Sequence, residues 1–260
     1  MKSPTHVTCV CLIAGVMSLA PCALAQSFNI DFSDGAAGPE TSYGAATGQT
    51  GFWNSMHPVH AGGNFPLMDL NGDPSAVIVS NIGGTGLPTT NDPATTGADE
   101  ALLDDYLVTF SAGLETCLFF KNMQPGTYVV TQYCWIPAAP SIMSYATVDQ
   151  SAEGAQIIGG AWTGQHEKFV TYSEHIAVVG ENGVLNTHSG IVPGADAMDG
   201  AALNGVQLRF VAGDFDGDAI VDGADLATLL SQWGNSGLAD LNGDGVVNGA
   251  DLAALLANWT

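Results

Sequence analysis

Two acidic stretches near the end of the chain have the residue types and spacing of a metal site. "DFDGDAIVDGAD" begins at residue 214 and "DLNGDGVVNGAD" begins at residue 240. Ca²⁺ takes six to eight oxygen ligands, and a twelve-residue loop supplies them from positions 1, 3, 5, 7, 9 and 12, the seventh through its backbone carbonyl. The sequence therefore predicts two Ca²⁺ sites. The first has the ligands Asp214, Asp216, Asp218, Ile220 (carbonyl), Asp222 and Asp225, and the second has Asp240, Asn242, Asp244, Val246 (carbonyl), Asn248 and Asp251.

The two stretches are copies of one unit. Residues 214–233 align with residues 240–259, and both loops are followed by apolar residues at helical spacing: Leu226, Leu229, Leu230 and Trp233 after the first, and Leu252, Leu255, Leu256 and Trp259 after the second. A solvated acidic tail would show neither the shared register nor the apolar stripe. The duplication therefore predicts two loop–helix repeats.

Both loops depart from the EF-hand pattern, which has Gly at the sixth position and Glu at the twelfth. Asp225 and Asp251 replace Glu, and Ala219 replaces Gly in the first loop only. A side chain in a turn that favours Gly costs about 1 kcal/mol. The first site is therefore predicted to bind Ca²⁺ more weakly than the second, and Ala219→Gly is predicted to tighten it.

The segment from about 214 to 260 resembles a type I dockerin domain. Dockerins consist of two calcium loops, each followed by a helix, without the entering helix of an EF-hand and with Asp at the twelfth loop position. The resemblance implies Ca²⁺ as the cofactor and a cohesin-like or cell-surface protein as the partner. Loop positions 10 and 11 are Gly-Ala in both copies, where the family has hydroxyl-bearing or bulkier pairs, so the identity of the partner stays open.

The first 25 residues have the pattern of a secretory signal peptide. A basic start at Lys2 is followed by an apolar stretch and by Ala23-Leu24-Ala25, which predicts cleavage after Ala25. No later stretch approaches the roughly 18 apolar residues needed to span a bilayer. We therefore expect a protein that is secreted or held at the cell surface, without a membrane span.

The charge balance excludes one class of partner. The chain has 26 acidic residues against four Lys and Arg, and a formal net charge of −22. Binding to nucleic acid depends on Lys and Arg that neutralise phosphates. Nucleic acid is therefore not an expected partner.

The remaining chain divides by composition. Residues 26–212 contain short β-branched and aromatic runs separated by Gly, Pro, Asn and Asp, which is typical of an all-β sandwich. Residues 33–66 have the composition of a long loop, and residues 98–107 favour a short helix. The predicted fold is mainly β: a jelly-roll-like β-sandwich domain (26–212) followed by a small α, dockerin-like domain (213–260).

Two cysteines, Cys117 and Cys134, lie in the β region and flank a Pro-Gly turn signal. In an oxidising compartment such a pair favours a disulfide across a hairpin, with two buried free thiols as the alternative.

The β region weakly resembles galactose-binding-like and malectin-like jelly rolls in the runs "FNIDF", "PGTYVV" and "ALNGVQLRF". Such domains bind carbohydrate, so polysaccharide is a candidate ligand. Sugar rings stack on aromatic faces, and Trp53, Trp135 and Trp162 lie beside turn residues where a face could be exposed; packing in the core is the alternative. Asn54, Gln165 and Asn204 are candidate polar partners for sugar hydroxyls.

These observations lead to one leading hypothesis and two alternatives. The leading hypothesis is a secreted, non-catalytic β-sandwich, with carbohydrate as its candidate ligand, attached to a partner through the calcium-dependent C-terminal segment. The first alternative is a secreted polysaccharide hydrolase or lyase, whose pair of catalytic carboxylates the sequence does not identify. The second is a structural cell-surface protein in which calcium stiffens the C-terminus.

Overall fold

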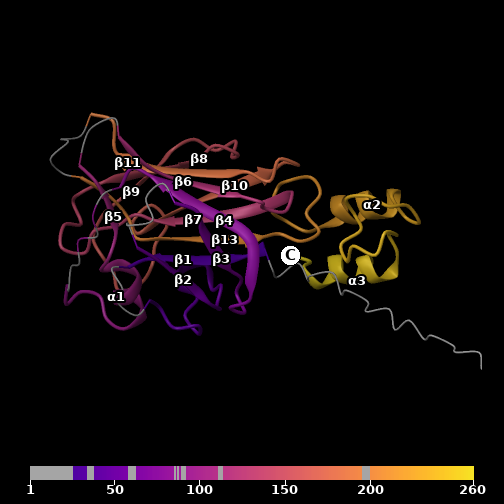
Figure 1. Cartoon of the computed structure of the whole chain (residues 1–260), viewed down its shortest axis with the longest axis horizontal. Helices are drawn as coiled ribbons and strands as arrows, with labels where there is room; N and C mark the ends of the chain where they lie inside the picture. Colours follow the sequence, from indigo (N-terminus) through magenta and orange to yellow (C-terminus); the bar gives the residue numbers. More distant parts are fainter. Residues whose placement is uncertain are drawn as a thin grey trace, which may run out of the picture.

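The computed structural model describes residues 26–33, 38–57, 63–84, 86, 88, 92–110, 114–194 and 200–260. The predicted signal peptide, residues 1–25, lies outside them. Strands form the body of the molecule, and a smaller lobe with two helices lies at one end (Figure 1).

The body is a sandwich of two sheets. The first sheet, called sheet A, has five strands in the spatial order β10 (Tyr172–Val179), β7 (Gly126–Tyr133), β13 (Gly205–Phe210), β1 (Phe28–Phe32) and β2 (Trp53–Met56). The second, sheet B, has six strands in the order β3 (Phe65–Met68), β4 (Pro74–Ile82), β6 (Glu115–Lys121), β11 (Leu185–Ile191), β8 (Ser144–Val148) and β9 (Gln156–Ile158). A two-stranded sheet pairs β12 (Ala201–Leu203) with β5 (Leu107–Thr109). The pairs within these sheets are antiparallel except for β1 with β2.

The hydrophobic core lies between the two large sheets. Alternate residues of β6 and β10 are buried, as expected for strands that each cover one side of a core. Side chains of both sheets meet there, including Phe28 and Tyr128 from sheet A and Leu118 and Phe120 from sheet B, all fully buried. The prediction of a mainly β sandwich is confirmed.

The sequence patterns missed strands whose residues do not alternate in polarity. β2 and part of β3 lie in the segment 33–66 expected to be a loop. β11 contains the polar run "NTHSG", which is held between β6 and β8 by pairing on both edges. Tertiary pairing decides the conformation in these segments. The short helix expected within 98–107 is present as α1 (Ala98–Leu103).

The C-terminal lobe, residues 213–260 and called here the C-terminal module, contains two nine-residue helices, α2 (Gly223–Ser231) and α3 (Gly249–Ala257). Each begins with a capping box, in which the N-cap side chain and the third helical residue satisfy each other's backbone N–H groups. The predicted loop–helix pattern is thus present in both repeats.

The module packs directly on the sandwich. Its own core contains Val221, Leu229, Val247 and Leu255, and Val129 of strand β7 joins the same cluster. A strand of sheet A therefore supplies part of the surface against which the module folds. Among the described residues, no helix is both long and apolar enough to cross a membrane.

The predicted Cys117–Cys134 disulfide is wrong, because both thiols are free. The two cysteines do not flank a hairpin: Cys117 belongs to β6 of sheet B, whereas Cys134 follows β7 of sheet A. Cys134 is buried in the core between the sheets, and Cys117 is one of the half-exposed positions that alternate with buried ones on β6. Their side chains therefore lie on opposite sides of sheet B.

Candidate metal centre

The first loop gathers three carboxylates at its beginning. Oxygen atoms of Asp214, Asp216 and Asp218 all lie within 4.8 Å of one another. The Asp214 carboxylate is buried and accepts hydrogen bonds from the backbone N–H groups of Gly217 and Ala219, both at 2.7 Å. The backbone therefore wraps around the first ligand position and fixes it.

The second loop repeats this arrangement. Asp240 accepts hydrogen bonds from the backbone N–H groups of Asp244 at 3.1 Å and Gly245 at 2.7 Å. The fifth-position carboxylates match as well, since Asp218 and Asp244 each accept the N–H of the residue two positions later, at 2.8 and 2.9 Å. The two loops thus share the N–H contacts of their sixth and seventh residues, whereas the second N–H bound to the first Asp comes from the fourth residue in one loop and the fifth in the other.

The twelfth residue of each loop joins the start of the loop to the helix. Asp225, fully buried, accepts the N–H groups of Phe215 at 2.7 Å and Asp222 at 2.8 Å. Asp251, also fully buried, accepts those of Asn242 at 3.1 Å and Asn248 at 2.8 Å. Each of these carboxylates, at the third position of its helix, holds the loop in its folded conformation. The short side chain of Asp suits this position.

Each loop is also joined to the chain that follows the other helix. The N–H of Thr260, after α3, donates to the carbonyl of Val221 at 3.1 Å, and the N–H of Gly234, after α2, donates to that of Val247 at 2.9 Å. The eighth residue of each loop is the acceptor in both cases. The repeats therefore support one another through reciprocal hydrogen bonds.

The electrostatics of the two loops differ. In the first loop, desolvation and the neighbouring charges of Asp218, Asp225 and Asp214 raise the pKa of Asp216. In the second loop, the N–H of Val246 and the amide of Asn242 lower the pKa of Asp244. In the first loop the neighbours of the Asp216 carboxylate are other carboxylates, whereas in the second loop the side-chain amide of Asn242 donates a hydrogen bond to the Asp244 carboxylate.

The sixth position has the backbone conformation expected from the sequence. Ala219 has φ 66°, in the left-handed region, and Gly245 has φ 93° at the equivalent place. Only Gly adopts this conformation without a steric cost. The expectation that Ala219 occupies a turn suited to Gly is confirmed.

The donor set fits a hard divalent cation. The ligand positions offer carboxylate, amide and carbonyl oxygens with no sulfur or imidazole, which is the chemistry that Ca²⁺ prefers. The side chains of Ile220 and Val246 carry no oxygen, so the seventh position can offer only its backbone carbonyl. The residues present therefore suit the predicted cation, and Ca²⁺ binding itself stays a prediction.

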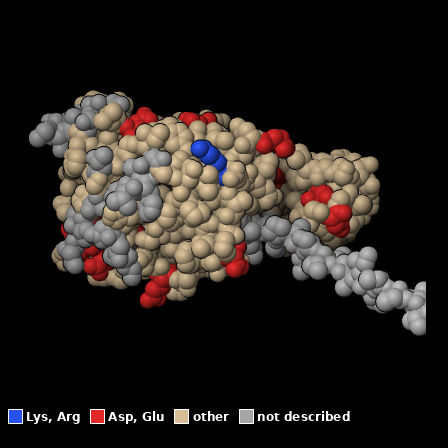
Figure 2. Space-filling model, in the orientation of Figure 1, with Lys and Arg blue, Asp and Glu red and all other residues tan. Residues whose placement is uncertain are grey.

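A cleft of about 300 Å³ lies between the module and the sandwich. Asp214 and Asp216 of the first loop and Asp240 of the second line it on one side, and Glu181 and Phe210 line it on the other. Acidic groups are visible on both the sandwich and the module in Figure 2, with little basic surface between them. The loops therefore border an acidic junction.

The three tryptophans singled out in the sequence come together in one cluster at a different part of the sandwich. Trp53 and Trp135 are only 5% and 1% exposed, and their indole N–H groups donate to the carbonyls of Tyr43 and Gly160. Of the two readings of these residues, packing in the core is the one that holds for Trp53 and Trp135, because both fill the space beside α1. Trp162 is half-buried against Trp135, with ring centroids 5.5 Å apart.

The candidate polar partners divide in the same way. Asn54 and Asn204 are buried and bond the backbone: Asn54 bonds Met68, and Asn204 accepts the N–H of Trp135 at 2.8 Å. They hold strands and loops together and cannot reach a sugar. Gln165 is exposed, close in sequence to Trp162.

The sequence analysis did not predict a group of three polar side chains beside this cluster, formed by Tyr43, Asp99 and His166. The hydroxyl of Tyr43 donates to Asp99 at 2.5 Å and lies 2.8 Å from Nε2 of His166. The His166 ring packs on Trp162, with centroids 5.6 Å apart, and burial lowers its pKa. These residues are 56 and 123 positions apart, and no local motif connects them.

Three buried carboxyl groups, those of Asp31, Asp104 and Asp105, are candidates for the catalytic carboxylates of the hydrolase or lyase alternative. Burial, with the charge of Asp105, raises the pKa of Asp31 well above its usual value, and burial raises that of Asp104 to about 6. Asp31 has no exposed surface. A fully covered carboxyl cannot touch a polysaccharide, so Asp31 is not a member of the missing catalytic pair.

No family model matches the chain, and no curated protein matches it. Solved structures similar to it include the ANXUR1 extracellular domain from Arabidopsis thaliana, with 14% identity over 70% of this chain and 47% of that chain and a TM-score of 0.39. A structure of the plant receptor-like kinase ANX1 has 13% identity over 70% and 48% of the two chains, with a TM-score of 0.38. The chain spans about half the length of these two receptor chains.

A CBM35 from Cellvibrio japonicus Abf62 has 11% identity over 52% of this chain and 93% of that chain, with a TM-score of 0.28. All three TM-scores lie below 0.5, so the similarities do not establish a shared fold or function.

Proposed function

We propose that the C-terminal module binds two Ca²⁺ ions and, in that state, attaches the secreted β-sandwich to a cohesin-like or cell-surface partner. The observation that carries the proposal is the repetition of one loop geometry, with equivalent backbone N–H groups bound to Asp214 and Asp240 and with three carboxylates within 4.8 Å in the first loop. Carboxylates gathered so closely repel one another, and a bound cation removes that repulsion.

Metal binding has a second physical reason. The module has fewer than 50 residues, and domains of this size seldom bury enough apolar surface to fold without a metal, a disulfide or another domain. The module contacts the sandwich through Val129, and Ca²⁺ would supply further free energy of folding.

The direct test is calorimetric titration of Ca²⁺ into chelator-treated protein, with two equivalents expected. Treatment with EDTA should reduce the far-UV helical signal and increase proteolysis within residues 213–260. Unchanged dichroism and unchanged proteolysis in EDTA would contradict the proposal. Mg²⁺ at equal concentration is the control, since it fits such flexible oxygen sites poorly.

Attachment to a partner is supported by apolar surface that the repeats leave uncovered. Leu230 and Trp233 after the first loop are 52% and 46% exposed, and the equivalent Leu256 and Trp259 are 52% and 45% exposed. Equivalent positions remain exposed in both copies, and exposed apolar patches mark interaction sites.

A type I cohesin domain is the defined probe for this surface. The full chain should bind it in Ca²⁺ and release it in EDTA, and Trp233→Ala with Trp259→Ala should abolish binding while leaving the Ca²⁺ titration unchanged. Ile157→Ala, on the sandwich and 46% exposed, is the matched control. No binding in Ca²⁺ would reject the cohesin partner and favour the structural, calcium-stiffened alternative.

Carbohydrate binding by the sandwich is a second candidate function. One observation favours it: Trp162 keeps part of its ring surface exposed while the buried Trp135 supports it from below. Trp162→Ala should then remove binding on a polysaccharide array, and Ile157→Ala should not. Release of reducing sugar from a bound polysaccharide would favour the hydrolase alternative instead, and release of unsaturated products would favour the lyase alternative.

A further inference from the structure

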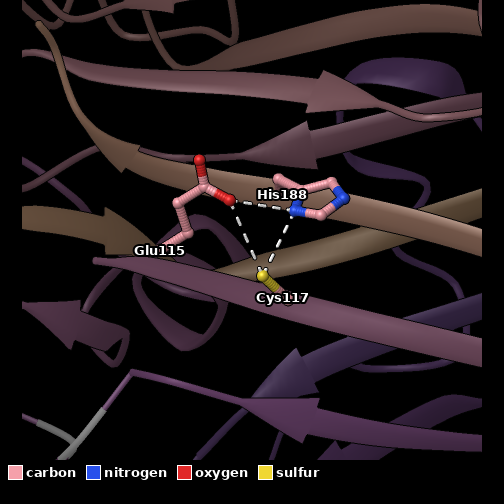
Figure 3. A group of neighbouring side chains, drawn as sticks. All are labelled: Glu115, Cys117 and His188. Atoms are coloured by element: carbon pink, nitrogen blue, oxygen red, sulfur yellow. Dashed lines mark hydrogen bonds and ion pairs between the residues drawn. The ribbon is translucent and has the colours of Figure 1, made fainter. Parts of the chain in front are cut away.

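Three side chains of different chemistry meet on the outer face of sheet B (Figure 3). Glu115 and Cys117 belong to β6, and His188 belongs to β11. Cys117 and His188 are directly opposite each other in the antiparallel register. Because side chains two apart on a strand share a face, Glu115 lies beside them on the same side of the sheet.

The ligand-type atoms of this group converge. Sγ of Cys117 lies 3.2 Å from Nδ1 of His188, and that nitrogen lies 3.0 Å from Oε2 of Glu115. Sγ and Oε2 are 3.8 Å apart. A tetrahedral Zn²⁺ with bonds of about 2.0 to 2.3 Å holds its sulfur, nitrogen and oxygen ligands about 3.3 to 3.7 Å from one another. Small side-chain adjustments would bring all three atoms to those separations.

Neighbouring residues orient two of the three side chains. Nε2 of His188 lies 3.0 Å from Oδ1 of Asp149, an ion-pair distance without the geometry of a hydrogen bond, and Nδ1 is the nitrogen that faces the group. The hydroxyl of Tyr145 donates to Oε1 of Glu115, which leaves Oε2 facing the group. Gly190 makes room for this tyrosine, since a Cβ there would lie 2.9 Å from the ring. A small rotation of the ring would turn this contact into the carboxylate–histidine hydrogen bond that supports ligands in zinc sites.

The same atoms could instead be read as a nucleophilic thiol with a histidine base and the Asp149 carboxylate. The electrostatics argue against that reading. Burial and the Glu115 carboxylate raise the pKa of the Cys117 thiol to about 11, whereas a nucleophilic cysteine needs a lowered pKa. A cation between the sulfur and the carboxylate would reverse this effect.

We propose that Glu115, Cys117 and His188 form a Zn²⁺ site with one open coordination position, oriented by Asp149 and Tyr145. Its sulfur and imidazole ligands select a borderline-soft cation, in contrast to the all-oxygen loops of the C-terminal module. Three protein ligands leave the fourth position on the solvent side of the sheet for water or another small ligand.

Cobalt(II) is the spectroscopic probe for the site. The full chain, carrying Cys9→Ser, Cys11→Ser and Cys22→Ser, is kept reduced and saturated with Ca²⁺ before Co²⁺ is added. One equivalent should produce a thiolate-to-cobalt charge-transfer band, and Zn²⁺ should displace it. Oxygen ligands alone cannot give this band, so Co²⁺ in the calcium loops would not imitate it.

Two variants distinguish a ligand from a positioning residue. Cys117→Ser should abolish the band, whereas Asp149→Asn should keep it and weaken Zn²⁺ binding by about 10- to 100-fold. Glu153→Gln, an exposed carboxylate outside the group, is the matched control and should behave like the parent.

Glu115→Gln is a second ligand variant, for use if Cys117→Ser does not fold, and it should also weaken Zn²⁺ binding. Far-UV dichroism checks that each variant is folded. A band that persists in Cys117→Ser, or Zn²⁺ binding equal in all variants, would overturn the proposal.

Discussion

The two loops of the C-terminal module share one backbone design and differ in charge. Equivalent N–H groups bind Asp214 and Asp240, and equivalent carboxylates, Asp225 and Asp251, close both turns. The first loop has carboxylates at all five side-chain ligand positions, whereas the second has amides at the third and ninth. The shared contacts specify the fold of each repeat, and the differing positions tune its cation affinity.

Removing the first ligand is the strongest way to break this equivalence. Asp214→Ala or Asp240→Ala should each reduce the Ca²⁺ stoichiometry from two to one, because a ligand and the acceptor for two backbone N–H groups are lost together. Either substitution should also lower the helical signal of both repeats, because the hydrogen bonds of Val221 with Thr260 and of Val247 with Gly234 join each loop to the chain after the other helix. Calorimetry with far-UV dichroism measures both effects. Two sites of unchanged affinity in either variant would contradict the ligand assignment.

The helices test whether the repeats are also equivalent in packing. Leu229 and Leu255 are both fully buried in the module's core. Leu229→Ala and Leu255→Ala should each lower the free energy of unfolding of the module by about 2 to 5 kcal/mol. Denaturant titration in saturating Ca²⁺ measures the change.

Leu230→Ala is the control for this pair, since Leu230 is 52% exposed and its replacement should change stability by about 0.5 kcal/mol or less. A loss confined to one of the two leucine variants would show that the repeats are not equivalent in packing.

Exchanging the ninth residues isolates the effect of charge. Asp222 and Asn248 cap their helices identically, each accepting the N–H two residues later at 2.8 Å, so Asp222→Asn and Asn248→Asp keep the cap. The first change should weaken Ca²⁺ binding to its loop by about 1 to 2 kcal/mol and the second should strengthen it by a similar amount. Both effects should shrink in high salt. Equal and salt-independent affinities in both variants would show that charge does not tune the loops.

The sequence predicted the loops well because all their determinants lie within twelve consecutive residues. Spacing placed the carboxylates of Asp214, Asp216 and Asp218 together, and the left-handed turn at Ala219 followed from the comparison with Gly245. The short buried strands of the sandwich were also visible from alternation. β2 and β11 were missed because pairing partners far along the chain, and not their own residues, stabilise them.

The side-chain groups of the sandwich were not predictable for the same reason. Cys117 and His188 are 71 residues apart and meet only through the register of β6 with β11. The disulfide prediction failed at this step, since it placed both cysteines in one hairpin and β6 and β7 belong to different sheets. The sequence likewise left exposure and core packing open for Trp53 and Trp135, because nearby turn residues do not reveal which face of a strand is covered.

The smallest expected effect concerns Ala219, where strain and charge oppose each other. The strain at Ala219 makes the first loop the weaker site, as the sequence predicts, whereas its two additional carboxylates favour tighter binding. Ala219→Gly should tighten the first site by about 1 kcal/mol, or about fivefold in Kd, and leave the second unchanged. Calorimetry on the parent and the variant gives both affinities. If the first site is the weaker one in the parent and the tighter one in Ala219→Gly, strain decides the ranking of the two sites. If the first site is already the tighter one in the parent, charge decides it. An unchanged Kd of the first site in Ala219→Gly would show that the φ of 66° costs no free energy in the bound loop.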